Sequence, residues 1–314
     1  MLTALVLFSL LSDHHSATDP TASPYPLMGE YLTTTQPRAA VAEGADKPKR
    51  SQEVTFHGVQ VRPLPDDGGK KQYELVIYPG GLPGNGWNPH SPDDAPSRRA
   101  VGVEEAERVV ATMMRVDRTS PTIGLPAPNG AVVLFDAADP NLDHWAAGAE
   151  LLDGYLKAGA ESEQTFGSGT LHVEYRVPLQ VEKLDTWRGN SGVYIQNRYE
   201  VQVLESFGDI IRDNGSGSIY KLHTPPQNMA LPPGVWQTLD IVFTAASFDG
   251  ETKTEPARMT VRHNGVTLFD DVPVPTVTNG NKLAESPSDG PLHLQDHGDP
   301  VVYRSVWFQP AQTN

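Results

Sequence analysis

The sequence contains no cysteine. This excludes disulfides, zinc–thiolate sites, iron–sulfur clusters and a thiol nucleophile. It leaves the cellular compartment open, because a chain of 314 residues can bury a large core without disulfides. Basic residues are also scarce, with 24 Lys and Arg against 39 Asp and Glu, which gives a formal net charge of −15. We therefore expect no nucleic-acid partner, because a phosphate backbone favours clustered positive charge.

Long hydrophobic runs are missing as well. The apolar run Leu2–Leu11 is interrupted by Thr3 and Ser9 and is too short to span a bilayer, so no membrane span is expected. The run is typical of the apolar part of a secretory signal, although no basic residue precedes it and the cleavage site is poor. We expect export to the periplasm or the extracellular space. A frayed N-terminus or a wrongly chosen start codon is the alternative.

Helical periodicity is limited to one short segment, while Gly and Pro, at 28 residues each, indicate many turns. Residues 1–50 are predicted to be a signal segment followed by a disordered linker rich in Pro, Thr, Ser and Ala. Residues 51–130 are predicted to form a small β-rich module. In it, strands Glu53–Pro63 and Gln72–Tyr78 flank a hairpin at Asp66–Gly69, and Val103–Met114 is the best helix candidate.

Residues 131–314 are predicted to form a series of short strands, which are separated by loops rich in Gly, Pro, Asn and Asp. The pair Asn264-Gly265 predicts a type I′ hairpin, and Asn197-Arg198 joins two further strands. Many short strands with almost no helix predict an all-β fold, an antiparallel β-sandwich of the jelly-roll, concanavalin A-like kind. The small β-rich module and one short helix precede it.

Several of these strands carry one polar face, because side chains alternate across a strand. These polar faces carry mainly Glu, Gln, Arg and His, whereas a sheet face that is only solvated typically carries Lys, Thr and Ser. The polar residues are His172, Glu174 and Arg176; Glu200 and Gln202; His293, Gln295 and His297; and Arg304. Each face is a solvated side of a sheet in the simplest interpretation. Together they favour a concave sheet that binds a carbohydrate, with Trp187 and Tyr194 stacking on a sugar ring. Asp296 and His297 are possible ligands of a divalent metal ion, and a surface turn explains them equally well.

Five segments, in order, resemble the signature blocks of the 3-keto-disaccharide hydrolase domain family. They are Gly189–Gln196 (GNSGVYIQ), Arg198–Leu204 (RYEVQVL), Pro232–Thr238 (PPGVWQT), Val261–Val266 (VRHNGV) and Leu294–Gly298 (LQDHG). The resemblance covers roughly Val132–Phe308. The region Tyr25–Trp87 resembles a small module that precedes this domain in some members.

The resemblance implies a concanavalin A-like or laminin-G-like sandwich and a glycoside substrate oxidised to a ketone at C3. Such a ketone acidifies the C2 hydrogen, so that a base forms an enolate and the C1 substituent leaves by elimination. Water then adds for net hydrolysis. The reaction needs a base, a group that stabilises the enolate and an acid for the leaving oxygen.

Our first hypothesis makes Glu200 the base, His297 the acid and Lys221 the group that stabilises the enolate. Seven further residues would contact the substrate: Glu174, Arg176, Asn190, Tyr194, Gln202, Gln295 and Arg304. An ion pair between Glu200 and Arg176 on neighbouring strands is the structural alternative. A carbohydrate-binding module without catalysis is the second hypothesis. A conventional glycosidase is a weaker third, because Gln202 stands where its second carboxylate is needed.

Overall fold

The computed structural model describes residues 23–33, 56–183 and 185–312. The apolar run Leu2–Leu11 and most of the expected linker lie outside these residues, so export stays a prediction. No helix in the described part of the chain is long and apolar enough to cross a membrane.

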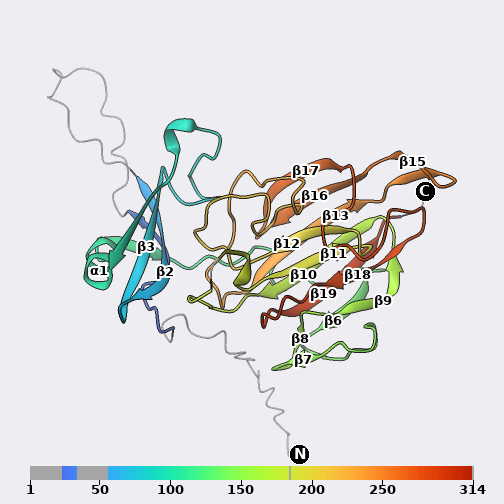
Figure 1. Cartoon of the computed structure of the whole chain (residues 1–314), viewed down its shortest axis with the longest axis horizontal. Helices are drawn as coiled ribbons and strands as arrows, with labels where there is room; N and C mark the ends of the chain where they lie inside the picture. The colour runs from blue at the N-terminus through green and yellow to red at the C-terminus, as the bar shows by residue number, and fades with distance from the viewer. Residues whose placement is uncertain (1–22, 34–55, 184, 313–314) are drawn as a thin grey trace, which may run out of the picture.

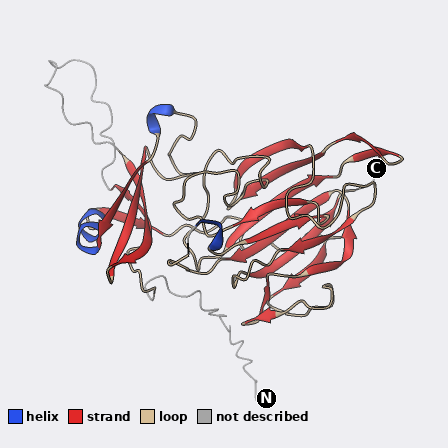
Figure 2. Cartoon of the chain, in the orientation of Figure 1, coloured by secondary structure: helices blue, strands red, loops and turns tan. Residues whose placement is uncertain are grey.

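The described chain folds as an N-terminal sheet that stands beside one end of a larger β-sandwich (Figure 1). Strands are the main regular elements of both parts (Figure 2). The helical elements among the described residues are short: α1 (Val103–Val110), on the side of the N-terminal sheet away from the sandwich, and the 3₁₀ turns η2 (Pro92–Asp94) and η3 (Asp185–Trp187). The predicted all-β class with one short helix is confirmed.

The N-terminal sheet is antiparallel, with strand order β4-β3-β2-β1-β5. Its strands are β1 (Gly29–Thr33), β2 (His57–Asp67), β3 (Lys70–Pro79), β4 (Ser97–Gly102) and β5 (Met113–Val116). The predicted hairpin is present, because Asp67 pairs with Lys70 across Gly68 and Gly69, both at positive φ.

Two expectations about this part are wrong. Strand β1 lies within the stretch expected to be a linker, and it pairs with both β2 and β5. Its Tyr31 is buried in the core of the N-terminal sheet, a contact that local composition does not reveal. The helix ends at Val110 rather than Met114, because Met113 pairs with Thr33 of β1 and packs against the same core. Long-range pairing here overrides helical periodicity.

The sandwich has one large and one small antiparallel sheet. The large sheet has the order β17-β16-β13-β10-β19-β8-β7, and β6 also pairs with β19. Its strands are β6 (Val132–Asp136), β7 (Leu151–Leu152), β8 (Tyr155–Lys157), β10 (Gly169–Arg176), β13 (Gln237–Thr244), β16 (Ala257–His263), β17 (Val266–Val274) and β19 (Val302–Pro310).

The small sheet has the order β12-β11-β18-β9 and carries the candidate site. Its strands are β9 (Glu161–Phe166), β11 (Ser191–Ile195), β12 (Tyr199–Val203) and β18 (Gly290–Leu294); a separate hairpin joins β14 (Ser247–Asp249) to β15 (Thr252–Glu255). The core lies between the two sheets, where Leu171 and Val173 of β10 join a single apolar cluster with Val193 and Val201 of the small sheet.

Two turns fix the strand registers. Asn264 and Gly265 both have positive φ, as the predicted type I′ turn between β16 and β17 requires. Between β11 and β12 the left-handed positions are Gln196 and Asn197, one residue earlier than the predicted pair. This hairpin places Tyr194 directly opposite Glu200.

The loop after β12 joins the sandwich to the N-terminal sheet. Phe207 is buried in the apolar cluster of the N-terminal sheet, although it follows directly from the small sheet of the sandwich. The carboxylate of Asp209 pairs with Arg62 of β2 on one oxygen and with Arg188 on the other, the latter at 2.7 Å. Arg188 immediately follows η3, so the N-terminal sheet is tied to a loop that reaches the candidate site.

Candidate active site

The outer face of the small sheet holds a depression of about 210 Å³. Alternation along β12 turns Tyr199, Val201 and Val203 into the core, so that Glu200 and Gln202 face outward. The predicted residues that line the depression are Asn190, Glu200, Gln202, Gln295, His297 and Trp187; Thr186, Tyr220, Asn279 and Gly280 complete its wall. The structure thus brings together four of the residues that the polar faces indicated, with Asn190 and Trp187 beside them.

Glu200 is the one carboxylate among the described residues that line the depression. It is 2% exposed, and its Oε2 accepts a 2.7 Å hydrogen bond from the hydroxyl of Tyr194. Burial raises the pKa of the Glu200 carboxyl to about 8, although the bond from Tyr194 acts in the opposite direction. A carboxyl with this pKa can exchange a proton near neutral pH, which suits a general base or acid.

Gly192 gives Glu200 the space that it occupies. Gly192 lies opposite Gln202 on the neighbouring strand, and a Cβ at this position would overlap Oε1 of Glu200. The carboxyl group therefore lies flat against the backbone of β11. This is the physical reason for a glycine in the GNSGVY block.

Tyr194 takes a different place from the one predicted. It is fully buried, so it cannot stack on a sugar ring. Its hydroxyl is 2.7 Å from the carbonyl of Asn279 as well as from Glu200, and the amide of Gln295 donates to it at 3.3 Å. The Tyr194 hydroxyl is thereby held in place by Glu200, Asn279 and Gln295.

Two amides form the polar floor beside Glu200. Gln202 donates to the side-chain oxygen of Asn190 at 2.8 Å, and the Asn190 amide donates to the carbonyl of Thr186 at 2.7 Å. The backbone N–H of Asn190 donates to Asp299 at 2.8 Å, and Asp299 is also paired with Lys183. Both amides are thereby held in fixed orientations, as a site that recognises hydroxyl groups needs.

The rim of the depression carries the groups that are open to solvent. Trp187 of η3 is 73% exposed, which is unusual for so large an apolar side chain. His297 is exposed on the loop after β18 and also lines the depression. An aromatic face at the rim and amides at the floor match the two ways in which proteins hold a sugar.

The residues predicted on β10 and β19 do not join this site. Glu174, Arg176 and Arg304 belong to the large sheet, on the opposite side of the sandwich. Glu174 is buried, pairs with Arg304 and accepts a bond from the backbone N–H of Gly124, in the segment that connects the two parts. Alternation shows which residues share a face of a strand but not which sheet the strand joins. The alternative pairing of Glu200 with Arg176 is excluded for the same reason.

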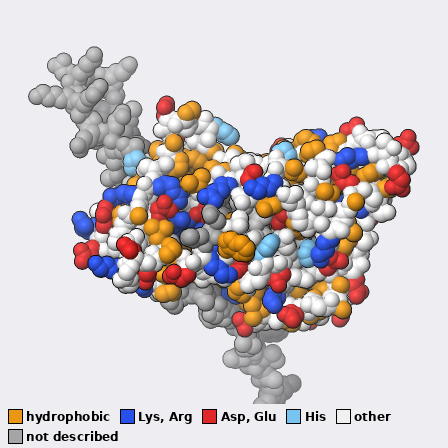
Figure 3. Space-filling view, in the orientation of Figure 1, with side chains coloured by type: hydrophobic (Ala, Val, Ile, Leu, Met, Phe, Trp, Pro, Cys, Tyr) orange, Lys and Arg blue, Asp and Glu red, His pale blue; other side chains and the backbone are white. Residues whose placement is uncertain are grey.

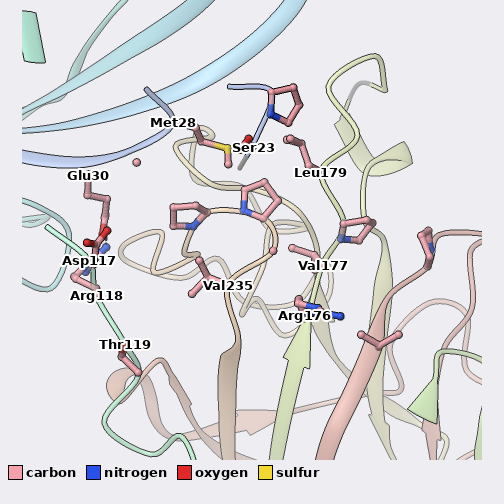
Figure 4. A pocket seen from close by; sticks show the side chains of 18 of the residues that line it. Ser23, Met28, Glu30, Asp117, Arg118, Thr119, Arg176, Val177, Leu179 and Val235 are labelled. Atoms are coloured by element: carbon pink, nitrogen blue, oxygen red, sulfur yellow. Dashed lines mark hydrogen bonds and ion pairs between the residues drawn. The ribbon is translucent and has the colours of Figure 1, made fainter. Parts of the chain in front are cut away.

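Arg176 lines another cavity, of about 570 Å³, between the N-terminal sheet and the sandwich (Figure 4). There its guanidinium lies 4.8 Å from the ring centre of Trp236, and that of Arg304 lies 4.7 Å from the same ring. Val177 and Val235 extend an apolar wall toward Met28. This cavity shares none of its lining residues with the depression on the small sheet.

Lys221 and Asp296 also lie outside the lining of the depression. Lys221 forms an ion pair with Asp213 at 3.0 Å, so its ammonium is engaged outside the lining of the depression. Asp296 accepts a 2.7 Å bond from the backbone N–H of Gly298, as a residue that shapes a turn does. In the described part of the chain no three His, Asp or Glu side chains are grouped to hold a metal ion. Asp296 and His297 thus fit the turn interpretation.

Sequence reasoning missed Thr186, Tyr220, Asn279 and Gly280. Tyr220 reaches the site because its loop runs along the edge of β12, where its backbone N–H donates to the Glu200 carbonyl at 3.1 Å. Asn279 and Gly280 come from the loop between β17 and β18. Neither segment has a periodic pattern. Only the position of Tyr220 directly before Lys221, a residue that we predicted in the site, could have indicated it from the sequence.

In comparisons with known proteins, a family model matches the sandwich but not the N-terminal sheet. The family described as "3-keto-alpha-glucoside-1,2-lyase-like domain" matches residues 130–309, which is the sandwich and more than half of the chain. Among curated proteins no match was found.

Three solved structures, all from Parabacteroides distasonis and each named "putative glycosyl hydrolase", resemble the chain. One is 30% identical with a TM-score of 0.54, and covers 59% of this chain and 85% of its own. The others are 18% and 16% identical, with TM-scores of 0.41 and 0.37; each covers 58% of this chain, and 100% and 95% of its own. The chain belongs to the family of the 3-keto-alpha-glucoside-1,2-lyase-like domain, as the five ordered blocks predicted.

Proposed function

We propose that the protein is a glycoside-cleaving enzyme whose substrates carry a ketone at C3 of the sugar, with Glu200 as the base. Family membership and the similarity to proteins named as glycosyl hydrolases support action on a glycoside. The observation that carries the rest is the single buried carboxyl group in the depression, with a pKa of about 8.

One carboxylate argues against a conventional glycosidase mechanism. Retaining and inverting enzymes use two carboxyl groups on either side of the glycosidic bond. Beside Glu200 this site has the amides of Gln202, Asn190 and Gln295. A substrate that is already activated by a ketone needs only one strong base, because the C2–H bond next to a carbonyl is acidic.

The proposed reaction has three steps. The carboxylate of Glu200 takes the C2 proton, and the C–H electrons form an enolate with its negative charge on the C3 oxygen. The enolate then expels the C1 substituent, and His297 donates the proton that the leaving oxygen needs. Addition of water across the new C1–C2 double bond returns the proton to C2 and places a hydroxyl on C1, so the overall change is hydrolysis. Release before this addition makes the enzyme a lyase.

The other groups in the depression would position the sugar. The second N–H of the Asn190 amide would donate to the oxygen of the enolate, where a preorganised donor stabilises developing charge. The side-chain oxygen of Gln202, whose own N–H groups bind Asn190 and the Val203 carbonyl, would accept from a sugar hydroxyl. Trp187 would cover one face of the ring, since an exposed aromatic face suits the C–H surface of a sugar.

A product assay tests the proposal. The protein is incubated with 3-keto-trehalose, 3-keto-sucrose and the two parent disaccharides, with and without a chelator, and free sugars are measured. We expect cleavage of at least one keto-sugar and of neither parent. Micromolar binding of unmodified oligosaccharides in calorimetry, with no cleavage of any keto-sugar, would instead identify a carbohydrate-binding module.

A further inference from the structure

A second hollow adjoins the candidate active site on the side of the N-terminal sheet. This hollow, here called the aromatic cavity, has a volume of about 560 Å³, and its wall includes Tyr78, Trp87, Pro89, Pro92, Ile210 and Ile211. The rings of Tyr78 and Trp87 meet edge to face at 5.2 Å between their centres. Trp87 is fixed by its indole N–H, which donates to the Asp94 carbonyl at 2.7 Å.

The aromatic cavity lies close to the depression around Glu200. A small recess of about 20 Å³ shares Thr186 with the depression. The same recess shares Asp209 and Ile210 with the aromatic cavity. Thr186 of the depression and Ile210 of the aromatic cavity therefore line the same recess, which places the aromatic wall of the N-terminal sheet and its loops beside the candidate site.

The two hollows differ in size in a way that suits a two-part ligand. At about 210 Å³ the depression is below the roughly 300–1,000 Å³ range of pockets for drug-sized ligands, whereas the aromatic cavity at about 560 Å³ lies within it. A single sugar ring fits the first. A larger substituent needs the second.

Three of the polar side chains that line the aromatic cavity, Arg98, Asn228 and Asp209, are already occupied within the protein, whereas His90 and Ser91, which also line it, have no side-chain hydrogen bond to the described residues. Arg98 binds Glu74 at 2.6 Å and the Gly208 carbonyl at 2.6 Å. The amide of Asn228 donates to the Ser206 carbonyl at 2.6 Å. Both oxygens of Asp209 are taken up by arginines.

A second sugar would require free hydrogen-bonding groups, because unpaired hydroxyls lose water without compensation. An apolar ring requires only apolar walls, and at 59% exposure Ile210 presents such a surface at the junction. The balance of free and occupied groups therefore favours an apolar ligand.

We propose that the aromatic cavity binds the aglycone of the substrate, and that this aglycone is a planar, mainly apolar group such as an aryl ring system. The proposal rests on the function proposed above and names its substrate class. It also gives the N-terminal sheet a role, because Tyr78 belongs to β3 and Trp87 to the loop that follows.

The test uses the full-length protein and an Ile210→Asp variant. Because Ile210 is largely exposed, a charge there is compatible with folding. Val133→Asp is the matched control, since Val133 is 43% exposed on β6, away from both hollows. The substrates are 2-naphthyl and methyl 3-keto-glucosides of the same anomeric configuration. The quantity compared between the wild type and each variant is the ratio of the two kcat/KM values; the difference between the leaving groups is the same in every protein and cancels in this comparison.

We expect Ile210→Asp to lower this ratio about tenfold, and Val133→Asp to leave it unchanged. An unchanged ratio in Ile210→Asp, or an equal loss of activity on 3-keto-trehalose, would overturn the aglycone assignment. If the protein cleaves no keto-glucoside, the proposed function is wrong. Calorimetry with unoxidised 2-naphthyl and methyl glucosides then tests, independently of cleavage, whether the aromatic cavity binds an aryl group. Tighter binding of the naphthyl glucoside that Ile210→Asp abolishes supports it, and equal or no binding of the two rejects it.

Discussion

Tyr194 and Glu200 lie opposite each other on β11 and β12, and their side chains are joined by a 2.7 Å hydrogen bond on the outer face of the sheet. The bond links a buried phenol to a carboxyl group whose pKa burial raises to about 8. Tyr194 stabilises the charged form of Glu200, so this pair sets the pH at which the proposed base becomes active.

The first prediction concerns pH. Only the carboxylate form of Glu200 can accept the C2 proton. Where removal of this proton limits kcat/KM and the step that uses His297 follows it, kcat/KM should rise about tenfold per pH unit below the pKa of Glu200 and stop rising near pH 8. Tyr194→Phe removes a bond that lowers this pKa, and the inflection should move to higher pH. Tyr25→Phe, in the N-terminal sheet, is the control. An inflection near pH 4 in the wild-type protein would contradict the assignment.

A second prediction concerns the space above β11. Gly192→Ala places a methyl group where Oε1 of Glu200 lies, so the carboxyl must move and kcat should fall about a hundredfold or more. Gly102→Ala adds a methyl group in open space and should leave kcat unaltered. Equal activities of the two variants in the keto-sugar assay would show that the position of Glu200 does not matter.

Trp187 provides a third test. Its removal in Trp187→Ala costs little stability, because the side chain is mostly exposed. Loss of one stacking face should weaken substrate binding by about 1 kcal/mol. This should raise KM roughly five- to tenfold, and kcat should change less. Steady-state kinetics on a keto-disaccharide measure both constants. An unchanged KM would remove Trp187 from the sugar site.

The junction between the two parts gives a fourth prediction. Phe207→Ala leaves a hole in the core of the N-terminal sheet, and the free energy of unfolding should fall by roughly 3–5 kcal/mol. Exposed Leu283→Ala should change it little. Limited proteolysis should cut the N-terminal sheet of the Phe207 variant first. Cleavage within the sandwich at the same rate would show that Phe207 does not join the two parts.

Local sequence patterns predict the sandwich and part of the site for clear reasons. The alternation in Tyr199–Val203 identifies Glu200 and Gln202 as outward-facing, and Asn264-Gly265 identifies a hairpin. The same reasoning fails for Glu174, because a buried ion pair and an exposed binding group have the same alternation. It also fails for β1, whose strand pairing depends on residues far along the chain.

Composition predicts the total charge of the surface but not where the charged side chains lie. The net charge of −15 predicts acidity but not its distribution. Acidic side chains are scattered over the visible face rather than gathered in one patch (Figure 3). The candidate site is accordingly not an acidic cluster, and its single carboxyl group is buried.

The most direct test of the account is the activity of Glu200→Gln. The amide keeps the size of the side chain but cannot accept the C2 proton. The pKa of Glu200 is raised in the folded protein, so the protonated side chain contributes to stability at low pH. This contribution is lost as the pH rises through about 8 and the carboxyl group ionises. The variant should therefore be at least as stable as the wild type at pH 9, as measured by thermal unfolding. We predict that this folded variant no longer cleaves any 3-keto-glycoside that the wild-type protein cleaves, whereas undiminished turnover would contradict the role of Glu200 as the base.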